Sequence, residues 1–182
     1  MKKIFFLLLS MAVLASCGSH NSKKIETYQD AEDAFVASLT NSDTTTVVAL
    51  TNSFLDRVKN GEIESAIQDI YVLYQGVLYR PADEYLQQLR TRFQTFPILG
   101  YTLERFSFST PGNNDCCYVY RFAEHVDGQP DKTMKLVFNP VYCEGCWYLT
   151  FKDGNQSSLD LPEDQQVLAN SPAPGEIHLN RQ

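Results

Sequence analysis

The hydrophobic period changes along this chain, and this change constrains the fold more than any other feature. Up to about residue 97, apolar residues recur at intervals of three and four, which is the period of an amphipathic helix. From Ile98 onward they alternate with polar residues, which is the period of a half-buried strand. Helices followed by strands indicate an α+β domain.

Three helices are expected in the first part of the domain. The first spans residues 44–60, because a Ser-Asp-Thr cap precedes it and an Asn-Gly pair ends it. The second begins at residue 61, and its apolar face continues as far as residue 74. The third spans residues 81–96, with one proline in its first turn and another after its end. A weaker apolar stripe at residues 28–39 predicts a short leading helix.

Four strands are expected after the helices. Short turns rich in glycine, proline and asparagine separate them and make the last three strands a meander of antiparallel hairpins. The expected architecture is therefore a set of helices packed on one face of a curved four-stranded antiparallel sheet. The positions expected to face inward are Phe106, Phe108, Tyr118, Tyr120, Phe122, Met134, Leu136 and Phe138.

The N-terminus carries a segment of signal-peptide length. Lys2 and Lys3 precede an apolar run, residues 4–14, which is too short to span a bilayer. The run leads into Leu14-Ala15-Ser16-Cys17, and small residues directly before a cysteine resemble the bacterial lipoprotein signal. The resemblance implies that residues 1–16 are a signal peptide and that Cys17 becomes the acylated lipid anchor.

The lipid anchor implies a cell-envelope location with the membrane as partner. Each buried CH₂ of an acyl chain contributes ~0.8 kcal/mol, so the two or three chains implied here would hold the protein permanently. Gly18 stands where a sorting aspartate would otherwise be, which by the same resemblance favours the outer membrane, on its periplasmic or surface face.

The rest of the chain divides into three parts. Residues 17–43 are expected to form a tether with the weak leading helix, residues 44–153 the α+β domain, and residues 154–182 a proline-containing tail. The formal net charge is -7, and removal of Lys2 and Lys3 takes it to -9. An acidic chain of this kind lacks the basic surface that nucleic acid requires, so nucleic acid is not an expected partner.

The order of these elements resembles the cystatin-like cone of the nuclear-transport-factor-2-like and SnoaL-like superfamily. The residues that carry the resemblance are Val47–Val58, the helix restart at residues 60–67 and the closing strand Cys146-Trp147-Tyr148-Leu149. Lipoproteins of this shape also resemble exported domains of unknown function in gut and oral Bacteroidetes. In the superfamily, a curved sheet wrapped over helices leaves a pocket at its wide end, and members include isomerases, cyclases and non-catalytic domains.

The resemblance also implies an alternative function, an isomerase or cyclase that uses the cone pocket. Ketosteroid-isomerase-like members need a carboxylate base facing a tyrosine or a protonated carboxylic acid. The inward strand positions hold no Asp or Glu before Glu124, at a strand end, so no catalytic residue is assigned. No cofactor is expected either.

Five aromatic residues could line a pocket for a hydrophobic ligand. The alternative, which we favour, is that they pack the core, because aromatic side chains dominate the cores of small domains. The five residues are Tyr71, Tyr74, Tyr118, Tyr120 and Trp147.

Four cysteines beyond the anchor are the most unusual local feature. Exported chains meet an oxidising compartment, so Cys116, Cys117, Cys143 and Cys146 are disulfide candidates. We expect them to cluster at one end of the sheet, with at least one bridge between the adjacent pair and the Cys143/Cys146 turn; three pairings stay open. A zinc site is less favoured, because adjacent cysteines point to opposite sides of a strand, so no metal is assigned.

The functional hypothesis is a lipid-anchored envelope protein that binds a small hydrophobic ligand or an envelope protein without performing chemistry. The alternatives are the isomerase or cyclase above and a structural module of an envelope complex. No nucleophile elbow, phosphate loop or metalloprotease motif occurs in the sequence.

Overall fold

The structure is a computed structural model of the chain, and it describes residues 27–74 and 76–152. The expected signal peptide, Cys17 and the tail from residue 154 lie outside the described residues. No helix of the described part is both long enough and apolar enough to cross a membrane. The elements in chain order are α1 (Tyr28–Ser38), α2 (Asn41–Lys59), α3 (Ile63–Ile67), β1 (Val72–Tyr74), β2 (Val77–Tyr79), α4 (Asp83–Thr95), β3 (Gly100–Thr110), β4 (Asn113–Arg121), β5 (Thr133–Cys143) and β6 (Cys146–Lys152).

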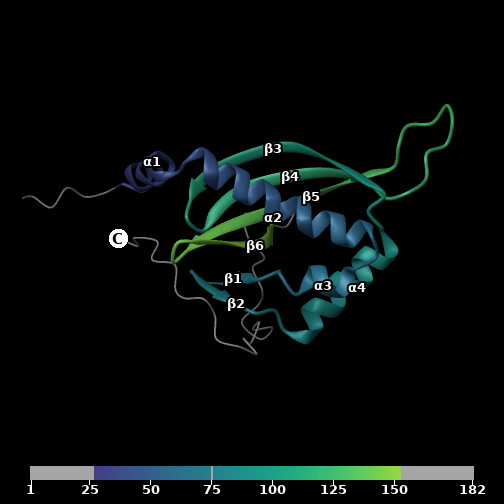
Figure 1. Cartoon of the computed structure of the whole chain (residues 1–182), viewed down its shortest axis with the longest axis horizontal. Helices are drawn as coiled ribbons and strands as arrows, with labels where there is room; N and C mark the ends of the chain where they lie inside the picture. Colours follow the sequence, from purple (N-terminus) through teal and green to yellow (C-terminus); the bar gives the residue numbers. More distant parts are fainter. Residues whose placement is uncertain (1–26, 75, 153–182) are drawn as a thin grey trace, which may run out of the picture.

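A four-stranded antiparallel sheet forms the centre of the domain. Its strand order is β3-β4-β5-β6, so each strand pairs with the next one in the chain. Figure 1 shows the curved sheet with α2 lying across it and with α3 and α4 gathered near one end. The predicted α+β class is confirmed, and the meander includes β3 as well as the three strands expected to form it.

The long helix α2 forms where the sequence predicts a helix. The Asp43 carboxylate accepts a hydrogen bond from the Thr40 backbone N–H at 2.8 Å, and this cap starts the helix at Asn41, slightly earlier than expected. The helix ends before Gly61, whose φ of 82° is readily adopted by glycine. Its buried side chains recur at helical spacing: Val47, Thr51, Phe54, Leu55 and Val58.

The predicted second helix, residues 61–74, is wrong beyond its first turns. Helix α3 ends at Ile67, and the chain continues into the two-stranded hairpin of β1 and β2. Residues 70–74 are rich in β-branched and aromatic side chains, which favour a strand. The Tyr71 N–H donates to the Leu149 carbonyl at 2.8 Å, so this run joins β6 instead of continuing the helix. A continuous apolar run fits both periods, and spacing alone therefore misassigned it.

The main hydrophobic core lies between α2, α3, α4 and one face of the sheet. Phe54 is fully buried, with edge-to-face ring contacts to Phe93, Phe138 and Phe151 at centroid distances of 5.7, 5.5 and 5.6 Å. Of the expected inward positions, Phe106, Phe122 and Met134 are partly buried against this core. The buried residues that the sheet contributes are Cys116, Tyr118, Tyr120, Leu136, Phe138, Leu149 and Phe151.

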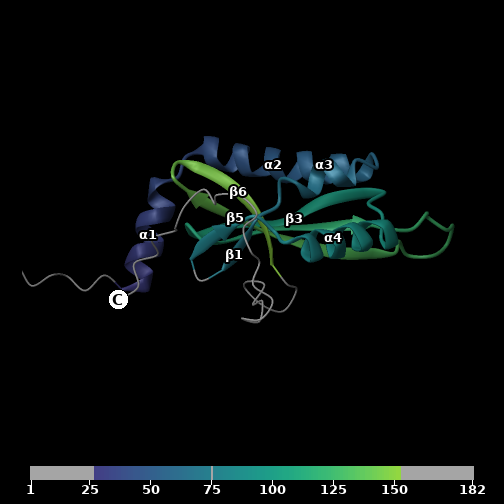
Figure 2. The ribbon, with the colours of Figure 1, turned by 90° about the horizontal axis from the view of Figure 1, so that it is seen from below.

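A second, smaller hydrophobic cluster lies under the β1–β2 hairpin. Leu78 of β2 and Val141 of β5 are fully buried there, and Cys143 is 4% exposed. Val141 and Phe138 are three residues apart on one strand, so their side chains point to opposite faces of the sheet. Figure 2 accordingly shows β1 on the side of β5 and β6 that faces away from α2.

Beyond this cluster, the face of the sheet that points away from α2 carries ion pairs. Lys135 pairs with Glu104 at 2.7 Å, and Asp115 pairs with both Lys152 and Arg105, at 2.7 and 3.3 Å. The sheet therefore has an apolar face under the helices and a largely charged face opposite, as the alternation of its strands predicts.

Candidate functional site

Two of the five predicted pocket aromatics are core residues. Tyr118 and Tyr120 are 1% and 0% exposed. The Tyr118 hydroxyl lies 2.8 Å from the Thr51 hydroxyl and donates to the Asn52 side-chain oxygen at 2.8 Å. Burial raises the pKa of Tyr118 far above its ordinary value, so this hydroxyl stays protonated. Both tyrosines thus occupy the space between helices and sheet that a cone pocket would need.

Tyr71 forms part of a separate aromatic group on the hairpin side of β6. Its ring packs edge-to-face on Tyr148 at a centroid distance of 5.0 Å, and the Arg80 guanidinium lies 4.1 Å from the centre of the Tyr71 ring. Arg80 is held in place because it also donates to the Gln68 carbonyl at 2.7 Å. All three side chains are partly exposed, and we call Tyr71, Arg80 and Tyr148 the hairpin aromatic site. Tyr74, the last residue of β1, is partly buried and lies three residues after Tyr71 in the sequence.

Trp147 belongs to a third location, under α1. Its ring stacks on Phe108 at 5.0 Å with an interplanar angle of 30°, and it also contacts Tyr142 and the buried Phe35 of α1. Phe108, expected in the main core, is instead a partly exposed member of this group. The five predicted aromatics are therefore distributed over the main core, the hairpin side of β6 and the α1 end, and they do not surround one cavity.

A hydrogen bond ties the α1 end to the start of α2. The Trp147 indole N–H donates to the Asp43 carboxylate at 3.0 Å. This bond, together with those from Thr40, holds the pKa of Asp43 below its ordinary value. Asp43 thus caps α2 and fixes the indole of β6 at the same time.

Several of the described acidic side chains form surface ion pairs. Asp69 pairs with Arg57, and Glu64 pairs with Arg90, both on the solvent side of the helices. Exposed pairs of this kind contribute little to stability.

Tyr101 and Asp56 form the contact that most resembles an acid–base pair. The Tyr101 hydroxyl donates to the Asp56 carboxylate at 2.7 Å. Burial, followed by the bond to Asp56, raises the pKa of Tyr101 to about 12. Asp56 itself lies on the exposed surface of α2, whereas an isomerase base of the ketosteroid type lies in a pocket.

The predicted clustering of the four cysteines is wrong in register. Cys116 pairs with Phe138 across β4 and β5, which places it five residues along the strand from Cys143. At about 3.3 Å per residue this separation is roughly 17 Å, well beyond the ~7 Å that a disulfide can bridge. The observed register centres the β4–β5 connection on Asp127, so Cys116 and Cys117 lie opposite the middle of β5 and not opposite its end. All four described cysteines are free thiols.

Within the turn, however, Cys143 and Cys146 lie directly opposite each other. Cys143 is buried and Cys146 is exposed. Burial raises the pKa of Cys116 to about 11 and also raises the pKa values of Cys117 and Cys143. Among the described residues, no group of three or more His, Cys, Asp or Glu side chains could hold a metal ion.

A shallow hollow lies elsewhere, on the outer side of α4. It encloses about 400 Å³ and is lined by Gln87, Gln88, Thr91, Arg92, Thr95 and Phe96. None of the predicted site residues lines it.

Sequence reasoning missed three residues that the structure brings to partly exposed aromatic groups: Arg80, Tyr142 and Tyr148. Tyr148 and Tyr142 were visible as alternating aromatics beside the expected inward positions. No sequence pattern indicated Arg80, because it reaches Tyr71 through the β1–β2 hairpin, which the hydrophobic spacing did not predict.

The comparisons with known proteins concern the N-terminus. Residues 1–17 match the family model described as a prokaryotic membrane lipoprotein lipid attachment site. The match ends at Cys17, the residue expected to carry the lipid. A search of curated proteins found no match, and a search of solved structures found none. The chain therefore carries a lipoprotein attachment site and is a lipid-anchored, membrane-associated protein.

Proposed function

We propose that the α+β domain is a non-catalytic module that binds a protein partner at the cell envelope. The observation that carries this proposal is the filled interior: Phe54, Tyr118, Tyr120 and Phe138 occupy the space between helices and sheet, each at most 1% exposed. A domain whose buried space is taken by its own side chains recognises partners through its surface.

The hairpin aromatic site is the surface that we assign to the partner. Tyr and Arg are the residue types most enriched at the energetic centres of protein interfaces, since they offer apolar area together with hydrogen-bonding groups. Here Tyr71, Arg80 and Tyr148 are ordered by ring and cation–π contacts, so little side-chain entropy remains to be lost on binding. A small hydrophobic ligand would need a deeper concavity than a partly exposed pair of rings.

The proposal also includes a specific membrane, the outer membrane, and a likeness to known domains. Gly18 supports placement in the outer membrane, with the signal peptide removed and palmitate or another acyl chain on Cys17. We also propose a likeness to the cystatin-like cone, which the order of helices and meander supports, and to exported domains of Bacteroidetes, which rests on the sequence resemblance alone. The hairpin between α3 and α4 was not predicted from the sequence, and Tyr71 and Arg80 of the proposed binding surface directly flank it.

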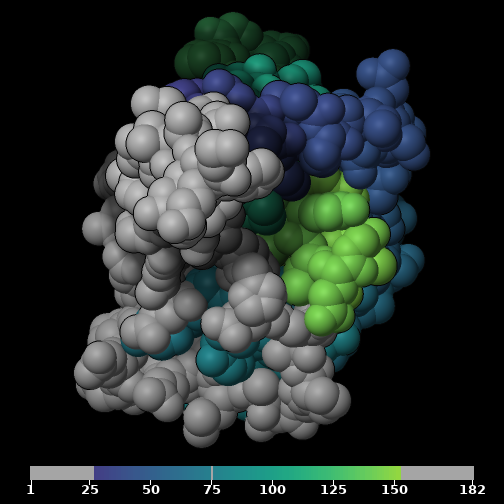
Figure 3. Space-filling view, turned by 90° about the vertical axis from the view of Figure 1, so that its left-hand side faces the viewer, coloured from purple at the N-terminus to yellow at the C-terminus, as the bar shows by residue number. Residues whose placement is uncertain are grey.

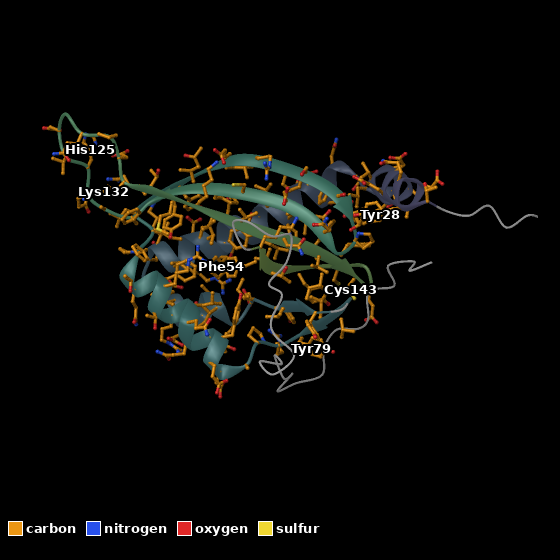
Figure 4. The ribbon with its side chains drawn as sticks, turned by 180° about the vertical axis from the view of Figure 1, so that it is seen from behind. Tyr28, Phe54, Tyr79, His125, Lys132 and Cys143 are labelled. Carbon is orange, nitrogen blue, oxygen red and sulfur yellow. The ribbon has the colours of Figure 1, made fainter. Side chains whose placement is uncertain are left out.

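Photocrosslinking in the native envelope tests the binding proposal. A benzophenone amino acid is placed at Tyr148 and, as a matched control, at Lys132 on the exposed β4–β5 loop. Figure 4 shows Lys132 at the end of the molecule opposite Tyr79 and Cys143. We expect one discrete protein adduct from position 148, lost when Arg80→Ala is added, and none from position 132. Equal adducts at both positions, or none at 148, would contradict the proposal.

The anchor has its own test. Radioactive palmitate should label the wild-type protein and leave a Cys17→Ala protein unlabelled. Separation of inner and outer membranes on a density gradient then places the labelled protein, and recovery with the inner membrane would overturn the outer-membrane assignment.

A further inference from the structure

The β5–β6 turn places two cysteines face to face. Cys143 is the last residue of β5, Cys146 is the first of β6, and they are direct partners in the strand register. The two turn residues, Glu144 and Gly145, have φ values of 49° and 81°, as a two-residue type I′ turn requires. Directly opposite residues of an antiparallel pair project to the same face, with Cα atoms about 4.5–5.5 Å apart. This spacing falls inside the range of about 4.4–6.8 Å found in disulfides.

The other two described cysteines cannot compete for either sulfur. Cys116 and Cys117 pair with Phe138 and Val137, far along the strand from the turn. They are also 0% and 3% exposed, so reagents reach them poorly. Within the described part of the chain, the turn therefore holds an isolated pair of thiols.

The two thiols of the turn differ in access. Cys146 is exposed, whereas Cys143 is 4% exposed and packs with Leu78 and Val141. Figure 3 faces this end of the molecule and shows the yellow-green atoms of the β5–β6 segment at the surface. A thiol reagent in solution would thus meet Cys146 first, and Cys143 would be the second, resolving thiol.

We propose that Cys143 and Cys146 form a redox-active dithiol that exchanges with small-molecule or protein disulfides of the envelope. The Cys146 thiolate attacks one sulfur of a disulfide R–S–S–R, which releases the first R–S⁻ and forms a mixed disulfide on Cys146. The Cys143 thiolate then attacks the Cys146 sulfur, which forms the Cys143–Cys146 bond and releases the second R–S⁻. The two released thiolates take up the two protons lost by the cysteines, so one disulfide is reduced as another forms.

The position of the pair gives this exchange a structural consequence. Cys143 belongs to the same cluster as Leu78, Tyr71 and Tyr148. Oxidation would fix the end of β5 to the start of β6 beside the hairpin, whereas reduction leaves this turn held by backbone pairing and side-chain packing. Burial raises the pKa of Cys143, and the ring-closing step should accordingly be faster at alkaline pH.

Equilibration with glutathione tests the proposal on the full mature chain extracted in detergent. The protein is incubated in mixtures of reduced and oxidised glutathione, quenched with acid, alkylated with a maleimide and measured by intact mass and peptide mapping. As the mixture becomes more oxidising, we expect two of the four thiols to be lost together and a Cys143–Cys146 crosslink to map to the turn.

Three variants separate the outcomes. Cys146→Ser should keep all its remaining thiols, while Cys143→Ser should accumulate glutathione on Cys146. The matched control, Cys116→Ser with Cys117→Ser, should be half-oxidised at the same glutathione ratio as the wild type. Four thiols that stay free in the most oxidising mixture, or a crosslink that maps to Cys116 or Cys117, would overturn the proposal. These measurements do not involve a binding partner, so they stand or fall independently of the proposed function.

Discussion

The main core and the second hydrophobic cluster under the β1–β2 hairpin, here called the hairpin cluster, are built from the same kinds of residue. They differ in how many elements of the fold surround them. Phe54 sits among side chains from three helices and four strands, whereas Leu78 is buried by a two-stranded hairpin and the ends of β5 and β6. An isolated two-stranded hairpin is marginal in water and depends on what it packs against. The difference indicates that the main core maintains the fold, while the hairpin cluster maintains the shape of one surface.

Truncation of the main core should have the largest effect. Phe54→Ala removes a fully buried ring with three aromatic neighbours and is expected to lower the free energy of unfolding by about 3–5 kcal/mol. Urea denaturation followed by far-ultraviolet circular dichroism measures the loss. A loss similar to that of a partly exposed aromatic, such as Phe96→Ala, would contradict the central position of Phe54.

Truncation of the hairpin cluster should act locally. Leu78→Ala is expected to cost about 2 kcal/mol, the lower end of the range for buried leucine, because the hairpin can relax onto the space that is left. Hydrogen exchange should accelerate at the amides of β1 and β2 and stay unchanged in α2. Acceleration that spreads equally to α2 would show that the two clusters unfold as one.

Substitution of the buried Thr51 tests the hydrogen bonding inside the main core. Thr51→Val removes the partner of the Tyr118 hydroxyl and should cost about 1–2 kcal/mol, because Tyr118 then keeps the bond to Asn52 alone. Thr51→Ser retains the hydroxyl and serves as the control for the change of side chain. If the valine and serine variants unfold at the same urea concentration, the hydrogen bond contributes nothing measurable.

The smallest effect is expected from pH at the α1 end. The folded pKa of Asp43 lies below its unfolded value, so its contribution to stability is complete above the unfolded pKa of about 4 and is lost as pH falls through the folded pKa. Trp147, the one tryptophan of the chain, donates to this carboxylate and reports the change by its fluorescence. Acidification below pH ~4 should alter the emission of the wild type and not that of Asp43→Asn. An identical transition in both proteins would assign it to another group.

Prediction from sequence succeeded where one period dominated a long segment. The spacing in α2 and the alternation of the four sheet strands predicted helix, sheet and meander, because each pattern extends over enough residues to exclude the other. It failed at residues 70–74, where consecutive apolar residues satisfy both periods and the contact with Leu149 decides the outcome.

The candidate site was less predictable for a related reason. The burial of Tyr118 and Tyr120 follows from alternation, and the favoured interpretation as core residues agrees with their exposure. The neighbours of Tyr71 and of the cysteines depend on register, and a small error in the β4–β5 turn displaced every cross-strand contact by several ångströms. Arg80 reaches Tyr71 through the hairpin, which local patterning does not encode.

The docking of α1 on the domain sets a mechanical limit on the whole protein. Residues 18–27 connect Cys17 to the start of α1, and ten residues span at most about 35 Å when fully stretched. Phe35 fastens α1 to Trp147 and Tyr142, and Glu32 of α1 accepts a hydrogen bond from Ser109 of β3, so we expect a pull from the bilayer to reach the sheet. The lipid attachment thus keeps β6, with the exposed Cys146 thiol and Tyr148, close to the membrane. Both residues would therefore meet partner molecules only in a thin layer above the lipid.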